Sequence, residues 1–331
     1  MHTEANILIL CMNKKIINIR AVAIIAIVLG HSIILYSEHW GIYTTIVKAP
    51  ILSIVKEIIN TFQLELFFAL SGFLFYKSIE KREGIIPFIK KKAVRLIIPY
   101  FCIAFCWMNP LKALLATPGF TDGRVIVKSI CNQLIFSSGS TGHLWYLPTL
   151  FGIFCLSYIF MIKIYKPNLQ GNMILIFLLL CGYLIGLYLP NYFQLNNILH
   201  YSIFFFMGYY LYYLNSHIIL DKYKWTILLC FLLAILGRIY STHFHLVYMA
   251  LFVLCIYTFI PDKTNQLIQL ISENSFGIYL IHSPLIYITF TYFKDGNPLF
   301  VLFLNFFIWG GVSLLLSYWI RKSRLKFFLG E

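Results

Sequence analysis

Charged side chains are scarce in this sequence. Only 11% of its 331 residues are Asp, Glu, Lys or Arg, whereas 60% are hydrophobic and 18% are aromatic. A soluble domain carries about 25% charged residues because its surface faces water. A single core cannot bury this much apolar side chain. The composition therefore excludes an ordinary soluble protein and favours a chain surrounded by lipid.

Acidic residues are the rarer of the charged types. There are 12 of them against 26 Lys and Arg, which gives a net charge of +14. Such an excess suits nucleic acid, but the basic residues lie in short stretches between apolar runs rather than on one soluble face. We therefore expect membrane lipids as partners and no nucleic acid.

Paired cysteines are absent as well. The eight cysteines are scattered, and none forms a CxxC pair. This pattern argues against a disulfide framework or a zinc site, and we expect no metal.

A cleavable signal peptide is also missing. Arg20 interrupts the first apolar stretch, and no small-x-small cleavage site closes it. The stretch Met12–Lys15 resembles a more natural start, so we expect residues 1–11 to be a dispensable extension. The remainder contains no soluble segment of domain size, which predicts one transmembrane domain over 1–331.

Long apolar runs are what the chain does have. A helix needs roughly 20 apolar residues to cross a bilayer. The runs predict an all-α, polytopic membrane helix bundle of about ten transmembrane helices, near residues 16–37, 58–78, 93–109, 143–162, 172–190, 197–214, 224–240, 244–261, 273–293 and 299–320.

The basic residues predict the orientation of this bundle. Cytoplasmic loops of membrane proteins are enriched in Lys and Arg. With both termini in the cytoplasm, most basic residues fall inside, and the following fall outside: Lys48, Lys56, Lys112, Arg124, Lys128, Arg238 and Lys294. We therefore expect cytoplasmic N- and C-termini.

The first span carries Arg20 and His31, separated by ten apolar residues. Eleven helical steps make about three turns, so both side chains should project from one face, about 16 Å apart. Ionisable residues inside a membrane usually serve a function. The alternative is that Arg20 reaches the cytoplasmic interface and His31 bonds a neighbouring carbonyl.

The second span carries Glu65, followed by Ser71 and Gly72, small residues that allow close helix approach. Counting residues from the ends of the spans places Glu65 and His31 at similar depth in the outer half of the bilayer, so the two could meet. A protonated Glu65 bonded to backbone is the alternative.

The third span opens with Lys90, Lys91, Lys92 and Arg95. Lys90 and Lys91 are typical of cytoplasmic anchoring. Lys92 and Arg95 share a face and could hold phosphates at a helix N-terminus.

Three later residues are candidates for binding. His143 and Trp145 stand at the outer start of the fourth span, where a loop hydrogen bond and interfacial anchoring are the alternatives. His282 lies near mid-membrane in the ninth span and could either support the site or pack.

Together these patterns resemble the acyltransferase-3 family of polytopic membrane O-acyltransferases. The resemblance covers essentially the whole chain and rests on five patterns in order: Arg20-x10-His31, Glu65 to Phe73, Lys92-x-x-Arg95-Leu96-x-x-Pro99, His143 to Leu147, and Ser275 to Pro284. Lys92 stands where the family often has arginine, which loses bidentate phosphate recognition.

The resemblance implies transfer of an acyl group, most simply acetyl from cytoplasmic acetyl-CoA or another acyl-CoA, to a sugar hydroxyl. The acceptor would be a surface glycan or its lipid-linked saccharide precursor, at a bacterial inner (cytoplasmic) membrane. His31 would act as general base or acyl carrier. Glu65 would orient and stabilise its imidazole, Arg20, Lys92 and Arg95 would bind the donor, and His143, Trp145 and His282 would contact the acceptor.

Two other classes of function are compatible with buried charges and aromatics in a membrane bundle. A transporter or flippase of a lipid-linked saccharide would move its substrate without consuming acyl-CoA. A sensor would bind acyl-CoA without turnover.

Overall fold

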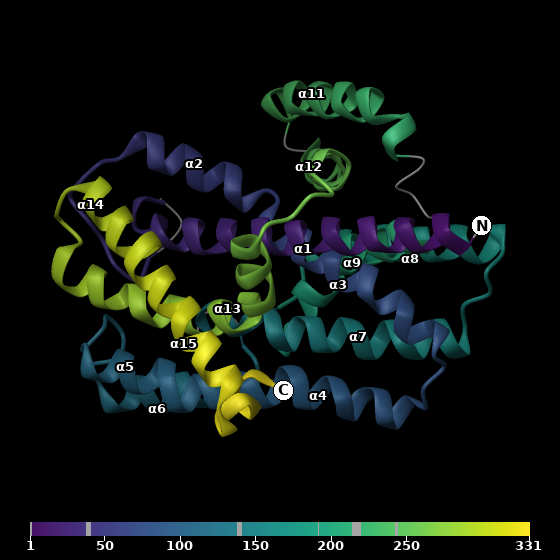
Figure 1. Ribbon diagram of the computed structural model, residues 1–331. Helices are drawn as coiled ribbons and strands as arrows, with labels where there is room; N and C mark the ends of the chain where they lie inside the picture. The colour runs from purple at the N-terminus through teal and green to yellow at the C-terminus, as the bar shows by residue number, and fades with distance from the viewer. Residues whose placement is uncertain (1, 38–40, 138–140, 191, 214–219, 242–243) are drawn as a thin grey trace. The chain divides into compact units, whose positions relative to one another are not determined.

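The computed structural model describes every residue except 1, 38–40, 138–140, 191, 214–219 and 242–243, and the side chains of 1–13, 213 and 240. The described residues form helices, turns and loops, with no β-strand among them. The predicted all-α class is confirmed (Figure 1). Part of the predicted boundary at 241–243 lies outside the described residues.

The first α-helices in chain order lie before residue 187. They are α1 (His2–Ser32), α2 (Pro50–Asn60), α3 (Gln63–Glu80), α4 (Ile85–Ile103), α5 (Asn109–Leu114), α6 (Gly123–Leu134), α7 (Tyr146–Lys163) and α8 (Leu169–Gly186). A π-helical segment, η2 (Ala104–Met108), joins α4 to α5, and a short turn, η3 (Gly142–Trp145), leads into α7. The second half contains α9 (Leu195–Tyr213), α11 (Lys224–Tyr240), α12 (His245–Phe259), α13 (Gln266–Phe293), α14 (Pro298–Phe303), η5 (Leu304–Trp309), α15 (Gly310–Lys322) and η6 (Arg324–Leu329).

Seven of the described helical stretches are long and apolar enough to cross a membrane. They are 14–32, 50–80, 85–114, 142–163, 169–186, 266–293 and 298–322. The other three predicted positions hold α9, α11 and α12, which do not meet that length and hydropathy. The count of ten and the cytoplasmic termini therefore stay predictions.

The described part of the chain separates into two compact units, each built from distant segments. Unit 1 comprises 1–27, 57–76 and 204–275, and unit 2 comprises 28–56, 77–203 and 276–331. Both units draw on the N-terminal, central and C-terminal thirds of the sequence, so neither is a contiguous domain.

Unit 1 is held by an apolar cluster and by glycines. Ile19, Leu66, Val253 and their neighbours form a buried core. A Cβ added at Gly72 would stand 1.7 Å from the Phe205 carbonyl oxygen, so α3 and α9 touch backbone to backbone. The close approach predicted at Gly72 is confirmed, since only glycine leaves room for it.

Hydrogen bonds between buried polar side chains help to stabilise unit 2. Asn109 and Gln133 exchange two side-chain hydrogen bonds, of 2.8 and 3.0 Å, between α5 and α6. The Tyr100 hydroxyl donates to the Gln133 carbonyl at 2.8 Å. Buried amides that bond each other satisfy their polar atoms without water, as a membrane interior requires.

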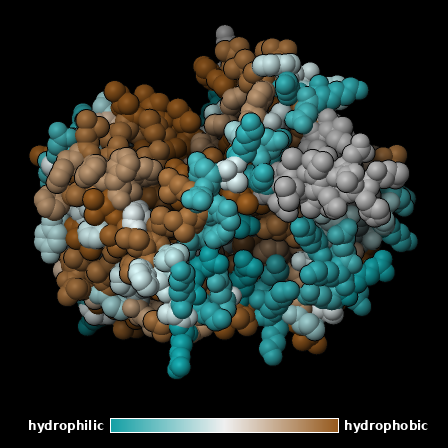
Figure 2. Space-filling model, in the orientation of Figure 1, coloured by the Kyte–Doolittle hydropathy of each residue, from teal (hydrophilic) through white to brown (hydrophobic). Residues whose placement is uncertain are grey.

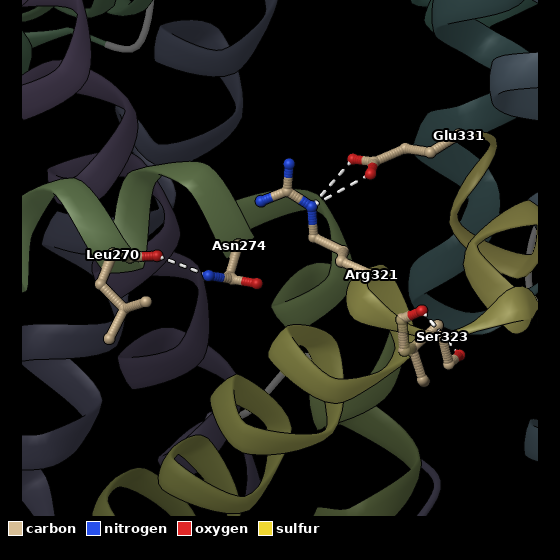
Figure 3. A network of polar contacts seen from close by, with 6 residues as sticks. Leu270, Asn274, Arg321, Ser323 and Glu331 are labelled. Carbon is tan, nitrogen blue, oxygen red and sulfur yellow. Dashed lines mark hydrogen bonds and ion pairs between the residues drawn. The ribbon is translucent and has the colours of Figure 1, made fainter.

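The C-terminal end of unit 2 folds back on α4. Gly330 adopts a left-handed conformation (φ +68°), and a Cβ there would stand 2.7 Å from the Arg95 carbonyl oxygen. Figure 3 shows the Arg321 guanidinium facing the Glu331 carboxylate, with Nε 3.1 Å from an oxygen. Ser323 caps η6 by accepting from the Leu325 N–H at 3.0 Å.

Large apolar side chains are exposed on the surface. The face at the left of Figure 2, over α2 and α14, is mainly hydrophobic. Exposed side chains of these helices include Ile51, Ile54, Leu299 and Phe303. A soluble protein rarely shows such a surface, whereas lipid tails cover it without cost.

Candidate active site

Three histidines meet in unit 2. His31 lies in the last turn of α1, His143 in η3 and His282 in the middle of α13. The ring centroids of His31 and His282 are 5.0 Å apart, those of His143 and His282 5.7 Å, and those of His31 and His143 6.4 Å. Residues more than 100 positions apart in the sequence thus form one cluster of imidazoles.

His31 and His282 are hydrogen-bonded through their rings. Nδ1 of His31 lies 2.7 Å from Nε2 of His282, and the two ring planes differ by only 9°. His282 is buried, and its other nitrogen, Nδ1, lies 2.8 Å from the Ile278 carbonyl oxygen one turn earlier in α13.

These partners assign the tautomers. A carbonyl oxygen only accepts, so Nδ1 of His282 carries a hydrogen and Nε2 of the neutral ring is an acceptor. Nδ1 of His31 must then donate to it. The second nitrogen of His31, Nε2, is left with a free lone pair, which is the form that a general base or a nucleophile needs.

The position of His143 depends on a proline in α13. Pro284 lies inside α13 and has no N–H, so the carbonyl of Leu280, four residues earlier, loses its helical donor. Nε2 of His143 lies 3.3 Å from that carbonyl oxygen. A side chain from another helix thus satisfies the freed backbone group, the usual remedy for proline in a membrane helix.

The turn that carries His143 is fixed by a tyrosine. The Tyr279 hydroxyl donates to the His143 carbonyl, and the two rings meet edge to face with centroids 5.5 Å apart. Nδ1 of His143 is buried and has no hydrogen-bond partner among the described residues. Since Nε2 carries the hydrogen, this orphan atom is an acceptor awaiting a donor.

Two lysines bring positive charge to the cluster. Lys56 on α2 acts electrostatically on His31, and Lys112 on α5 acts on His143. Both side chains are buried. The sequence placed these two lysines outside the membrane without assigning them a role.

The cluster is not arranged as a metal site. Within the part of the chain that the structure describes, no group of three His, Cys, Asp or Glu side chains is positioned to hold a metal ion. Four of the six ring nitrogens of the three imidazoles are hydrogen-bonded to one another or to the α13 backbone instead.

Trp145 lies in the same turn as His143 but faces another group. Its ring packs on Tyr201, with centroids 5.5 Å apart. No ring contact between Trp145 and the three imidazoles is found among the described residues. Its predicted contact with an acceptor stays a prediction.

Glu65 and Arg20 belong to unit 1. The depth estimate for Glu65 assumed a helix over 58–78, which is wrong: α2 ends at Asn60 and α3 begins at Gln63. Glu65 therefore stands in the first turn of α3, where a helix dipole stabilises a carboxylate. Its side chain is buried, and Oε2 has no partner among the described residues. Arg20 is partly exposed.

Lys92 and Arg95 lie well inside α4, which begins at Ile85. Their predicted position at a helix N-terminus is wrong, because the apolar run starts later than the helix does. The Lys92 ammonium stands 3.8 Å from the Phe154 ring centroid and 5.3 Å from that of Phe88. Arg95 is exposed. A role in donor binding stays a prediction for both.

The residues from α4 to α5 form one continuous helical stretch, 85–114. Lys92 and Lys112 are 20 positions apart on it, roughly 30 Å at 1.5 Å per residue. The three histidines gather at the Lys112 end. The basic cluster of α4 and the imidazoles thus stand about one bilayer core apart.

Comparison with protein families agrees with this layout. The model of the acyltransferase-3 family, described as an acyltransferase domain, matches residues 13–322. The chain belongs to the acyltransferase-3 family. As a member of that family it is a membrane acyltransferase, and its multiple apolar helices agree with a multi-pass protein. Neither the curated proteins nor the solved structures contain a match.

Sequence reasoning on this acyltransferase missed Tyr279, Lys112 and the effect of Pro284. A proline two residues after a membrane histidine was a usable signal, because it frees a carbonyl one turn earlier that some donor must satisfy. Nothing in the sequence indicates that His143 is that donor. Its position depends on the fold of the loop before α7.

Proposed function

We propose that this acyltransferase moves an acyl group, most simply acetyl, from cytoplasmic acyl-CoA to a sugar hydroxyl of a surface glycan or of its lipid-linked precursor. The observation that carries the proposal is the 2.7 Å hydrogen bond between Nδ1 of His31 and Nε2 of His282. It holds the reactive nitrogen of His31 unprotonated. The setting would be a bacterial inner membrane.

His31 is the general base in this mechanism. The acceptor hydroxyl gives its proton to Nε2 of His31 while its oxygen attacks the thioester carbonyl carbon. The carbon–sulfur bond then breaks, and the coenzyme A sulfur leaves with the proton returned by the imidazolium. The products are the ester and free thiol, so atoms and charge balance.

His282 is the positioning residue. Its Nε2 accepts from Nδ1 of His31 in both the neutral and the charged state, so the ring keeps one orientation through the step. The bond from Nδ1 of His282 to the Ile278 carbonyl fixes which nitrogen accepts. An acyl group carried briefly by Nε2 of His31 uses the same geometry and stays a second route.

Glu65 was expected to orient the imidazole of His31, and that pairing stays a prediction because the two residues lie in different units. Nδ1 of His31 is bonded to His282. A catalytic role for Glu65 stays part of this proposal. Its side chain is buried in unit 1, and Oε2 has no partner among the described residues.

The donor would enter from the cytoplasmic side. Arg95, exposed on α4, is the better candidate for its phosphates, with Lys92 and Arg20 as further cations. A donor with its charged end near Arg95 and its thioester near His31 must be long and narrow. The pantetheine arm of an acyl-CoA has that shape.

The first test measures how much acyl-CoA thioester the protein consumes and how much glycan ester it forms. Purified protein in proteoliposomes is given acetyl-CoA and candidate glycans, and loss of thioester and gain of glycan ester are measured together. The proposal expects both, in equal amounts. Saccharide movement without thioester loss would support the flippase, and binding of acetyl-CoA without product would support the sensor; either result rejects the proposal.

A further inference from the structure

A pocket lies beside the histidines in unit 2. It has a volume of about 340 Å³, within the range of roughly 300–1,000 Å³ that small-molecule sites occupy. Residues of α5, α6 and the loop between them, together with Ile42, form its walls. Its polar lining residues are Lys112, Thr117, Lys128, Ser129 and Asn132, and none of the described residues that line it is acidic.

Lys112 is the unusual member of this lining. Its side chain is only 7% exposed, and no carboxylate pairs with it among the described residues. The Tyr287 and Phe120 rings stand 5.4 and 5.6 Å from its ammonium nitrogen. Ring faces recover part of the cost of burying the charge but do not neutralise it. A buried ammonium with no protein anion beside it points to an anion that arrives with a ligand.

The loop over this pocket is tightly folded. Ala116 and Gly119 both have positive φ, of +46° and +78°, and Thr117 bonds back to the Lys112 carbonyl through its N–H and its hydroxyl, at 3.0 and 3.2 Å. Alanine is strained in that conformation. The loop is therefore held in place around Lys112.

The pocket adjoins the catalytic histidines. A Cβ placed on Gly142, the residue before His143, would stand 3.9 Å from the Lys112 ammonium nitrogen. Tyr287 lies on α13 five residues after His282. A molecule whose anion reaches Lys112 therefore extends next to the turn of His143, whose orphan Nδ1 can accept a hydrogen bond from a hydroxyl.

We propose that this pocket binds the acceptor by an anionic group, so that the acceptor is an acidic saccharide carrying a carboxylate or a phosphate. Lys112 and Lys128 neutralise the group, Ser129 and Asn132 bond its oxygens or neighbouring hydroxyls, and Nδ1 of His143 accepts from a sugar hydroxyl. The inference rests on the proposed function for calling this ligand the acceptor, but the binding itself does not.

Equilibrium binding tests the pocket without any turnover. The full chain in phosphatidylcholine nanodiscs is dialysed against radiolabelled glucose, glucuronate or glucose 1-phosphate, with no acyl-CoA present. We expect the two anions to bind at least about tenfold more tightly than glucose, since charged hydrogen bonds contribute at this scale. Preference for one anion over the other distinguishes carboxylate from phosphate.

Variants decide whether Lys112 is responsible. Lys112→Met keeps the length of the side chain and should reduce anion binding to the level of glucose, whereas Lys112→Arg should retain most of it. Lys128→Gln, at an exposed position, should weaken it severalfold. Lys48→Gln removes an exposed lysine outside the pocket and should leave binding unchanged.

Three outcomes would overturn the inference: equal binding of glucose and the anions, undiminished anion binding in Lys112→Met, or loss of sugar binding when phosphatidylglycerol is added. The last would assign the pocket to lipid headgroups. Acyl transfer with charge-blind sugar binding would reject the inference and leave the proposed function standing. Charge-selective binding without acyl transfer would reject the proposed function and leave the inferred anion site standing.

Discussion

Nε2 of His143 donates to the carbonyl of Leu280, the backbone group that Pro284 leaves without a helical partner. The carbonyl that Pro284 frees within α13 is thus a binding point for the turn η3. His143 bonds the carbonyl of Leu280 in α13, and His282 lies two residues further along the same helix, so one stretch of α13 positions both imidazoles. His31 is hydrogen-bonded to His282. A proline that weakens a helix in isolation therefore helps to assemble the site.

Restoring the missing N–H should disturb this arrangement. In Pro284→Ala the new N–H competes with His143 for the Leu280 carbonyl, so His143 loses its fixed position. We expect kcat to fall severalfold to tenfold, while the thermal midpoint stays equal or rises, because a helical hydrogen bond is regained. Pro99→Ala makes the same chemical change in α4, away from the imidazoles, and serves as the control. Equal loss of kcat in the two variants would contradict the role of Pro284.

His282 can be tested by rescue. His282→Leu removes the acceptor for Nδ1–H of His31 and should lower kcat by about 10². His282→Gln offers an amide oxygen that accepts the same bond, and should recover at least about tenfold of that loss. A purely structural role predicts that Leu, being apolar, is tolerated better than Gln in this buried position. Steady-state kinetics of the two variants, with expression levels compared, separates these results.

The donor end can be tested by charge reversal. Arg95→Glu should raise KM for acyl-CoA strongly with little effect on acceptor KM, because a carboxylate repels the phosphates. Lys92→Met keeps the contact with Phe154 while removing the charge, and should raise donor KM less. Lys90→Glu is the matched control on the same helix. A rise in acceptor KM with donor KM unchanged would show that the two cations serve another ligand.

The prediction for Glu65 concerns coupling. Glu65→Gln should lower kcat strongly, and combining it with His31→Ala should add little, since groups acting on one step are not additive. The rates of the wild type, both single variants and the double variant give the coupling. Defects that simply multiply would mean that Glu65 serves α3, as a carboxylate in a helical first turn does, and not the reaction.

The class of fold could be predicted from the sequence because a segment that crosses lipid must satisfy its own backbone hydrogen bonds. Runs of about 20 apolar residues can only be helices, and few basic residues interrupt them. The ends of helices were less predictable: α4 begins eight residues before the predicted span over 93–109, because Lys90, Lys91 and Lys92 interrupt the apolar pattern without interrupting the helix. The break between α2 and α3 coincides with Asn60, Thr61 and Gln63, a polar interruption that the predicted span over 58–78 did not treat as a helix end.

The sequence predicted which residues form the candidate site better than it predicted the contacts between them. His31, His143 and His282 were each identified from local pattern, and the structure brings them together. Depth arithmetic paired His31 with Glu65, and this pairing stays a prediction because the two residues lie in different units. The contact between His31 and His282 was not predicted. Depth along one helix does not determine which faces meet, because that depends on the rotation and crossing of helices. For Lys112 the sequence predicted only a position outside the membrane. Its contact with the turn of His143 depends on how the helices pack, which the sequence does not show.

The catalytic role of His31 is tested by comparing His31→Ala with the wild-type protein in one assay. Both are reconstituted in proteoliposomes, matched for insertion and amount, and the transfer of labelled acetyl from acetyl-CoA to an acidic saccharide is measured in a single turnover. With His31 as general base, we expect the variant to bind donor and acceptor normally but to transfer acetyl at least about 10²-fold more slowly, within the 10²–10⁴-fold that a general base contributes. Transfer at a near-normal rate would contradict that role.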